Sequence, residues 1–246
     1  MDLDWNEQQK LLKNAAREFL ERECPTALVR DCERSPDGYS PALWKKMADL
    51  GWMGLIIPEQ YGGLGSGLLD LAVISEEMGR FVVPSPFLNT VVLCGLPTLE
   101  AGTEQQKRYV LPKIASGELI MSLALTEPSA KYTADGVQVR ARRSGDHYVI
   151  EGTKLFIEDA HIARNLLCVV RTGDGASAED GISLLFMDST SPGITMTPLK
   201  TTALDKQFEV VFKGVQVPTH NLLGQEGKGW PVVARALQKA VALQCA

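Results

Sequence analysis

The sequence predicts an α+β multidomain protein: an N-terminal α-helical domain, an antiparallel β-barrel or sandwich in the middle, and the start of a C-terminal helical domain. Changes of pattern along the 246 residues predict this. Apolar residues recur at helical spacing in residues 1–117, whereas residues 118–225 hold short runs rich in Val, Ile, Leu and Phe between turn residues. Helical spacing returns in residues 226–246, and a chain of this length can bury more than one core.

Helix-start signals recur through residues 1–117. Asp4 begins a capping-box pattern, and Ser40 followed by Pro41 matches an N-cap with proline at the first helical position. Thr103 is expected to open a short helix that ends before Pro112, because proline lacks the N–H that a helix needs. These signals predict a helical domain over residues 1–117.

The middle of the chain has the pattern of a meandering sheet. A hairpin is predicted around Ser144-Gly145-Asp146, between two runs of alternating apolar residues. The runs NLLCVVRT, GISLLFMD and FEVVFKGVQVP follow, separated by loops. Because no long helical pattern lies between them, the strands are expected to be antiparallel.

The last segment, residues 226–246, is predicted to be the first helix of a further domain. Val233, Leu237, Ala240 and Val241 share one face of this helix. The sequence stops at Ala246 while the helix is still apolar, so we expect a helical domain to follow and the apolar face to be unpaired here.

Composition excludes several classes of protein. The net charge of −5 opposes nucleic acid as the main partner, because that partner requires a basic face. No apolar run approaches the roughly 20 residues of a transmembrane helix, so no membrane partner is expected. The five cysteines are scattered without a Cys-x-x-Cys, and the three histidines lack metal-ligand spacing. Free, mostly buried thiols and a cytoplasmic location without a bound metal are therefore predicted.

Two local features have a plain structural interpretation. The loop YGGLGSG does not have the spacing of a nucleotide-binding turn and follows no strand, so it is predicted to be a tight loop between helices. His161 is an acid–base candidate only if Glu158 or Asp159 beside it acts as its partner. The alternative, a histidine in a surface turn, is favoured.

Charged runs are interpreted as solvated faces. This applies to Glu76-Glu77 in a helix, and to Arg140, Arg142 and Arg143 near a predicted hairpin strand. The arginines alternate with small apolar residues, as exposed positions on a half-buried strand do.

The segment Thr126-Glu127-Pro128 is a candidate ligand site. Pro128 ends the preceding strand, and Thr126 offers a hydroxyl group at the strand end. A hydroxyl and backbone amides at a sheet edge can hold a flat polar heterocycle.

Several segments in order resemble the acyl-CoA dehydrogenase family over essentially the whole length. The segments are LWKKMADLGWMGLIIPEQYGGLGSGLLDLAVISEEMGR, MSLALTEPSA, GDHYVIEGTKLFIEDAHIARNLLCVV and VQVPTHNLLGQEGKGW. The resemblance implies a helix–sheet–helix fold, bound FAD, and α,β-dehydrogenation of an acyl-CoA thioester. It also implies an electron-transfer flavoprotein as acceptor and a homo- or hetero-oligomer of acyl-CoA dehydrogenase-like subunits.

Carried over by position, the resemblance assigns flavin and substrate contacts. The flavin contacts implied are Leu123, Leu125, Thr126, Phe156, Ile157 and Glu158, and the substrate contacts are Lys131 and Tyr132. Phe156 stands where the family usually has tryptophan, and Glu158 where it has threonine or serine. Lys131-Tyr132-Thr133 replaces the usual Gly-Ser-Asp, with Lys131 a candidate for a phosphate of coenzyme A.

No catalytic base can be named within these residues. In the family a glutamate removes the α-proton while the β-hydrogen leaves as hydride to the flavin. One family position of that glutamate corresponds to about Ala240, with Val241 where arginine commonly follows, and the other lies beyond Ala246. Two functions stay open: a working dehydrogenase, and a non-catalytic or flavin-poor subunit of a hetero-oligomeric one. A flavin monooxygenase or oxidase relative is a lesser alternative.

Overall fold

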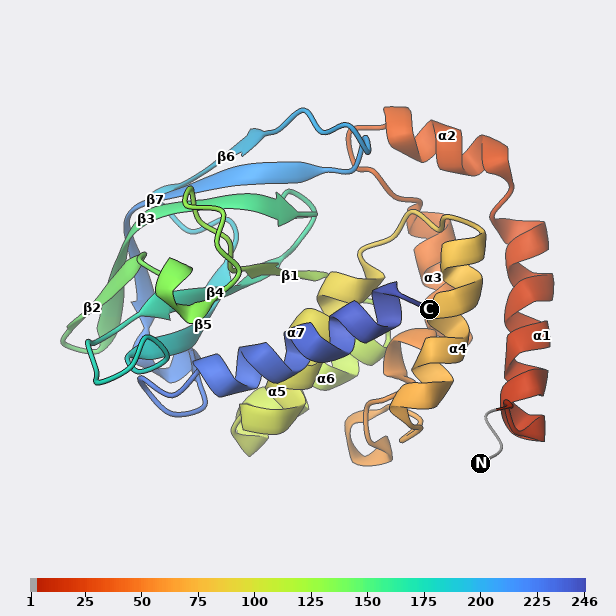
Figure 1. Ribbon diagram of the computed structural model, residues 1–246, viewed down its shortest axis with the longest axis horizontal. Coiled ribbons are helices and arrows are strands. Elements are labelled where there is room, and N and C mark those ends of the chain that lie inside the picture. The colour runs from red at the N-terminus through yellow and green to blue at the C-terminus, as the bar shows by residue number, and fades with distance from the viewer. Residues whose placement is uncertain (1–3) are drawn as a thin grey trace.

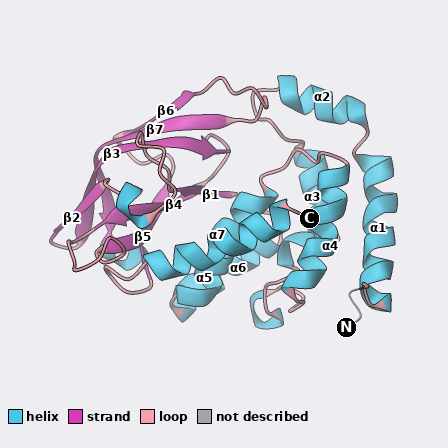
Figure 2. Cartoon of the chain, viewed as in Figure 1, coloured by secondary structure: helices cyan, strands magenta, loops and turns pink. Residues whose placement is uncertain are grey.

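The computed structural model of the chain describes residues 4–246. The sheet lies on one side of the molecule and most of the helices lie on the other (Figures 1 and 2). The first three residues of the predicted helical domain lie outside the described part. The helices are α1 (Glu7–Glu23), α2 (Thr26–Arg34), α3 (Pro41–Asp49), α4 (Leu68–Arg80), the π-helix η3 (Leu88–Gly95), α5 (Leu96–Ala101) and α6 (Glu104–Ala115). Two short 3₁₀ turns, η1 (Trp52–Gly54) and η2 (Glu59–Tyr61), precede the Gly-rich loop, which connects η2 to α4 as predicted.

The helix boundaries follow the sequence signals with two exceptions. The Ser40 side chain caps α3 as predicted, accepting a hydrogen bond from the amide of Leu43. The capping box of α1 is formed by Asn6 and Gln9 instead of starting at Asp4. Helix α6 does not stop before Pro112 but continues to Ala115, because a proline removes only one amide donor and the last turn packs into the core.

The prediction of a solvated Glu76-Glu77 pair is wrong for Glu77. Its side chain is fully buried where α4 packs against α1, and the Arg17 guanidinium donates to both carboxylate oxygens, at 3.0 and 2.7 Å. Glu77 follows Ile74 by three residues, so helical geometry places it on the apolar face. Glu76 is on the outside and pairs with Lys13.

The sheet has eight strands in the order β6-β7-β3-β2-β4-β5-β8, with β1 added beside β4. The strands are β1 (Met121–Ala124), β2 (Arg140–Ser144), β3 (His147–Glu158), β4 (Asn165–Arg171), β5 (Ile182–Asp188), β6 (Ile194–Pro198), β7 (Gln207–Pro218) and β8 (Leu222–Leu223). The predicted hairpin joins β2 and β3, with Ser144 opposite His147.

Most strand pairs are antiparallel as expected, but β4 runs parallel to β1 and, at one residue pair, to β2. The difference arises because the chain passes through the β2–β3 hairpin before it returns beside β1 in the same direction. Arg140, Arg142 and Arg143 are exposed on β2, as predicted.

Strand β3 is bent near its end. Its register against β7 shifts between Lys154 and Ile157, which marks a β-bulge. Within the bulge Phe156 has a φ of 58°, a left-handed conformation that is uncommon for a residue with a side chain.

Helix α7 (Trp230–Gln244) crosses the helical half of the molecule, in front of α5 in Figure 1. It packs against α4, α5 and η3, burying Val233, Ala236, Ala240 and Leu243. The expectation of an unpaired apolar helix is therefore wrong for this side. Val241, on the other side, remains 57% exposed.

Candidate functional site

A pocket of about 340 Å³ lies where β1 ends, the β3 bulge begins, and α7 passes η3. Its volume is near the lower limit of small-molecule sites in proteins. The strands and the loop after β1 contribute Leu123, Leu125, Thr126, Tyr132, Phe156, Glu158 and Gln207, and the helices contribute Leu88, Asn89, Leu93, Leu237, Ala240, Val241 and Gln244. The pocket therefore joins segments more than a hundred residues apart in the sequence.

Six of the eight residues that the resemblance assigned to flavin or substrate line this pocket. The other two do not. Ile157 is buried at 2% exposure on the opposite side of β3, because side chains alternate across a strand. The Lys131 side chain is 55% exposed and pairs with Asp135 at 2.6 Å. The roles of all eight as ligand contacts stay predictions.

The sheet-side wall combines an aromatic ring, a hydroxyl group and apolar side chains. Phe156 is 42% exposed, held outward by its left-handed backbone. Thr126 is 7% exposed, and its hydroxyl forms no hydrogen bond with any residue in the described part of the chain. Leu123 and Leu125 beside it are almost fully buried. An exposed ring and a hydroxyl with unused hydrogen-bonding capacity fit a flat heterocycle with polar edges.

Glu158 carries the carboxylate among the described residues that line the pocket. The amide of Asn89 donates to its Oε2 at 3.1 Å, and the Ser122 hydroxyl donates to its backbone carbonyl at 2.5 Å. Desolvation raises the pKa of Glu158, the Asn89 hydrogen bond opposes that rise, and nearby Asp205 adds to it. The carboxyl group is thus easier to protonate than a fully solvated glutamate, and its protonated form can donate a hydrogen bond.

The acid–base interpretation of His161 is not supported by its contacts. Its Nε2 donates to the carbonyl oxygen of Pro36 at 3.0 Å, and its ring stacks on Phe208 with centroids 4.6 Å apart. Burial lowers the pKa of His161. The neighbouring Asp159 has its pKa raised to about 7 by desolvation and by the charges of Glu158 and Asp205. His161 therefore links a turn of the sheet to the loop before α3.

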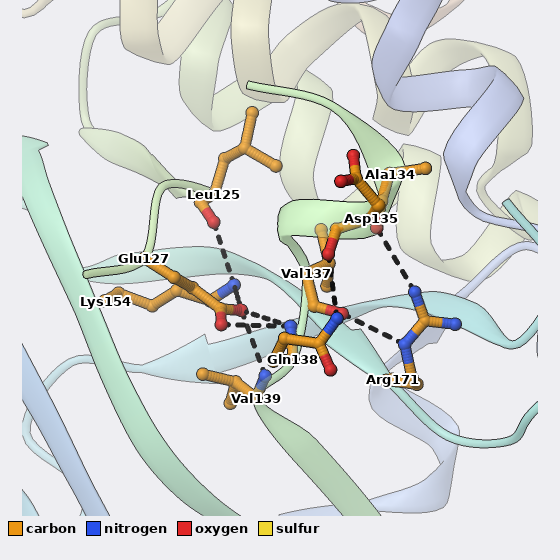
Figure 3. A network of polar contacts seen from close by, with 9 residues as sticks. All are labelled: Leu125, Glu127, Ala134, Asp135, Val137, Gln138, Val139, Lys154 and Arg171. Atoms are coloured by element: carbon orange, nitrogen blue, oxygen red, sulfur yellow. Dashed lines mark hydrogen bonds and ion pairs between the residues drawn. The ribbon is translucent and has the colours of Figure 1, made fainter. Parts of the chain in front are cut away.

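A buried ion pair lies beside the pocket, between Lys154 and Glu127 (Figure 3). The Lys154 ammonium group is wholly buried and donates to Glu127 Oε1 at 2.8 Å and to the Leu125 carbonyl oxygen at 2.9 Å. Glu127 also accepts hydrogen bonds from the backbone amides of Gln138 and Val139. Sequence reasoning missed this pair. The available signal was a lysine at an inward position of β3, where apolar residues are usual.

Arg171 extends the same network. Its guanidinium donates to the carbonyl oxygens of Val137 and Ala134, and also to those of Asp180 and Ala178. The loop before β2 is therefore tied to the sheet by two buried cations, one at each end of the network (Figure 3).

Comparisons with known proteins identify the family. The family model for "Acyl-CoA dehydrogenase, N-terminal domain" matches residues 6–118, and that for "Acyl-CoA dehydrogenase, middle domain" matches residues 122–215. The chain belongs to the acyl-CoA dehydrogenase family.

Individual relatives agree with this assignment. The chain is 33% identical to "Probable acyl-CoA dehydrogenase YngJ" of Bacillus subtilis, over 94% of this chain and 61% of the relative. An acyl-CoA dehydrogenase of Geobacillus kaustophilus has a TM-score of 0.89 at 30% identity, covering 99% of this chain and 66% of that one. The ChsE4–ChsE5 complex of Mycobacterium tuberculosis contains a chain with a TM-score of 0.86 at 30% identity, and the match covers 97% of this chain and 61% of that one. The chain thus spans about three fifths to two thirds of the length of these proteins.

A helix that crosses a membrane must be both long and apolar. Among residues 4–246, no helix is both long enough and apolar enough to span a bilayer.

Proposed function

We propose that this chain forms the flavin-binding part of a cytoplasmic, FAD-dependent acyl-CoA dehydrogenase that introduces an α,β double bond into an acyl-CoA thioester. The observation that supports this most directly is the meeting of Thr126 and Phe156 on one pocket. An unpartnered hydroxyl from the segment just after β1 and an outward aromatic ring from the bulge of β3 are what a flat flavin ring needs. Family membership supports the reaction class.

The residues present fit a flavin ring with one reservation. Phe156 would stack on the ring, the Thr126 hydroxyl would donate to its polar edge, and Leu123 and Leu125 would exclude water. When bound, FAD supplies the acceptor for the hydride that leaves the β-carbon. The reservation is Glu158, whose carboxylate adds negative charge to the same pocket. Its raised pKa reduces this conflict, because the neutral form carries no charge and can donate a hydrogen bond.

Substrate contacts are proposed at the rim. Tyr132 is 66% exposed and lines the pocket, so it can contact the acyl-CoA. Lys131 next to it can exchange its contact with Asp135 for a phosphate of coenzyme A, because an exposed ion pair costs little to break.

The α-proton requires a base that these residues do not supply. Ala240 and Val241 line the pocket at the place where the early glutamate and its arginine are expected, and neither can accept a proton. We propose that the base comes from protein outside residues 1–246. Electrons would pass to an electron-transfer flavoprotein, within a homo- or hetero-oligomer.

A second candidate follows from the same residues. Ala240, Val241 and Glu158 together replace the expected base, arginine and hydroxyl around one pocket. This favours a non-catalytic or flavin-poor subunit whose activity depends on a homologous partner. A chain similar to this one occurs in the ChsE4–ChsE5 complex, which has two named components.

Flavin content separates the two candidates. The full reading frame is purified alone, desalted, and its flavin per chain measured by visible absorption. About one flavin per chain, followed by flavin reduction with a suitable acyl-CoA, supports the dehydrogenase. A chain without flavin that gains activity only with a homologue supports the subunit and refutes the first proposal.

Glu158→Thr tests the pocket locally. Removing the carboxylate and restoring a hydroxyl is expected to tighten flavin binding by about three- to tenfold, measured by fluorescence titration. The matched control is Glu151→Thr, an exposed position on the same strand outside this pocket. Equal affinities for the two variants would place Glu158 away from the flavin.

A further inference from the structure

The sheet side of the pocket has two parts, here called walls: the segment that follows β1 and the bulge of β3. These two strands do not pair with each other. Strand β1, which leads to Thr126, pairs with β4, whereas β3, which carries Phe156, pairs with β2 and β7. No ladder of backbone hydrogen bonds in residues 4–246 therefore sets the separation of these walls. Some other contact has to hold the Thr126 hydroxyl opposite the Phe156 ring.

Three donor groups form hydrogen bonds between the walls. The Leu155 amide donates to the Thr126 carbonyl oxygen at 2.8 Å, and the Ser122 hydroxyl donates to the Glu158 carbonyl oxygen at 2.5 Å. Between these two, the Lys154 ammonium group donates to the Leu125 carbonyl oxygen at 2.9 Å. The bulge is thus attached to the end of β1 on both sides of Phe156.

Lys154 differs from the other two donors because it is a buried charge. Its side chain is 0% exposed, and a buried ammonium group without partners costs several kcal/mol. Its two acceptors, the Leu125 carbonyl oxygen and Glu127 Oε1, cannot be replaced by water at this depth. A shift of either wall would break one of these bonds inside an apolar surrounding, so the ammonium group resists relative movement of the walls.

Glu127 transmits the same constraint to the rim of the pocket. Its carboxylate accepts from the amide of Gln138 at 3.0 and 2.9 Å and from that of Val139 at 3.0 Å. The segment that carries Tyr132 runs from Glu127 to Gln138, within the connection between β1 and β2. Both ends of this segment are therefore fixed to one carboxylate (Figure 3).

We propose that Lys154 and Glu127 are positioning residues of the site, which hold the Thr126 wall, the Phe156 bulge and the Tyr132 segment in one arrangement. Neither residue lines the pocket; they act through the Leu125 carbonyl, the Leu155–Phe156 backbone and the Gln138 amide. The part of this inference that concerns flavin rests on the proposed function, whereas the mechanical part does not.

The test uses the full-length protein and needs two measurements. Hydrogen–deuterium exchange reports local opening without any ligand, and flavin titration reports the consequence for binding. The variants are Lys154→Met, which removes the ammonium group, and the milder Glu127→Gln. The matched control is Glu77→Gln, because Glu77 is also a buried glutamate held by a cation, but lies between α1 and α4 away from the pocket.

Lys154→Met is expected to speed exchange by about tenfold or more in residues 123–127 and 154–158, with α1 and α4 unchanged. The flavin dissociation constant should rise by about tenfold, and Glu127→Gln should show smaller effects in the same segments. Glu77→Gln should speed exchange in α1 and α4 and leave flavin affinity unchanged within about twofold.

Two results would overturn the inference. Lys154→Met and Glu127→Gln could speed exchange uniformly over the chain, which would mean that the pair only stabilises the fold; or they could leave both walls unaffected. If the wild type binds no flavin, the proposed function fails, and the exchange measurement still decides the positioning role.

A double variant, Lys154→Met/Glu127→Gln, separates stability from positioning. It removes both charges, so the urea midpoint should recover part of the loss seen in Lys154→Met. Exchange in residues 154–158 should stay fast, because the Leu125 carbonyl still lacks its donor. Full recovery of both properties would contradict a positioning role.

Discussion

Asp159 is expected to make the stability of this protein fall as the pH rises from about 4 to about 7. It lies in the turn after β3 at a φ of 56°, with Glu158 and Asp205 as its charged neighbours. Its carboxylate forms no hydrogen bond with the described residues, while its backbone amide donates to the Lys206 carbonyl oxygen at 2.9 Å. Asp159→Asn removes the charge and keeps the backbone, because asparagine tolerates the left-handed conformation well.

The size and sign of the effect follow from the pKa of Asp159. Desolvation raises this pKa to about 7, from an ordinary value of 3.8. Between those two pH values the unfolded chain releases a proton that the folded chain keeps, so stability falls as the pH rises and the loss is complete above about pH 7. The full difference corresponds to about 4 kcal/mol. Because Asp159 is only partly buried, we expect about 1 to 2 kcal/mol.

Urea unfolding followed by tryptophan fluorescence from pH 4 to 8.5 measures this effect. Asp159→Asn should be more stable than the wild type by about 1 to 2 kcal/mol at pH 8, and the difference should shrink toward zero near pH 4. The control is Asp49→Asn, which removes the same charge from a side chain that is 61% exposed. A stability gain that is the same at every pH, or absent at pH 8, would refute the reasoning.

Two further predictions concern thiols and the Gly-rich loop. Cys245 should be the one thiol per native chain that reacts quickly with an aromatic disulfide reagent, because it is exposed while the other four are buried and desolvation raises the pKa of Cys168 to about 11. Cys245→Ser should abolish the fast phase; a second fast thiol would contradict the burial. Gly63→Ala should lose at least about 3 kcal/mol in urea unfolding, since a Cβ would lie 1.9 Å from the Ile57 carbonyl oxygen. Gly65→Ala, which has open space and only backbone strain, should lose about 1 kcal/mol, and equal losses would show that the close contact does not matter.

Local structure could be predicted where the residues that determine it lie within one short segment. The Ser40 cap requires only a side-chain oxygen three residues before the amide of Leu43, and the β2–β3 hairpin requires only a turn between two alternating runs. The family could also be predicted, because its segments occur in order along the chain. Signals of this kind failed where a neighbouring residue competes, as when Asn6 instead of Asp4 capped α1.

Other features depend on segments that meet only in the folded chain. Glu77 resembles a solvated charge until α1 brings Arg17 against it, and β1 pairs with β4 after an intervening hairpin. The β3 bulge decided which of the predicted contacts share a pocket, because it turns Phe156 outward and leaves Ile157 inside. The sequence alone determined the family and the order of elements, because these depend on local pattern. Only the tertiary structure decided the pocket and the Lys154–Glu127 pair, because burial and charge pairing depend on residues that are distant in the chain.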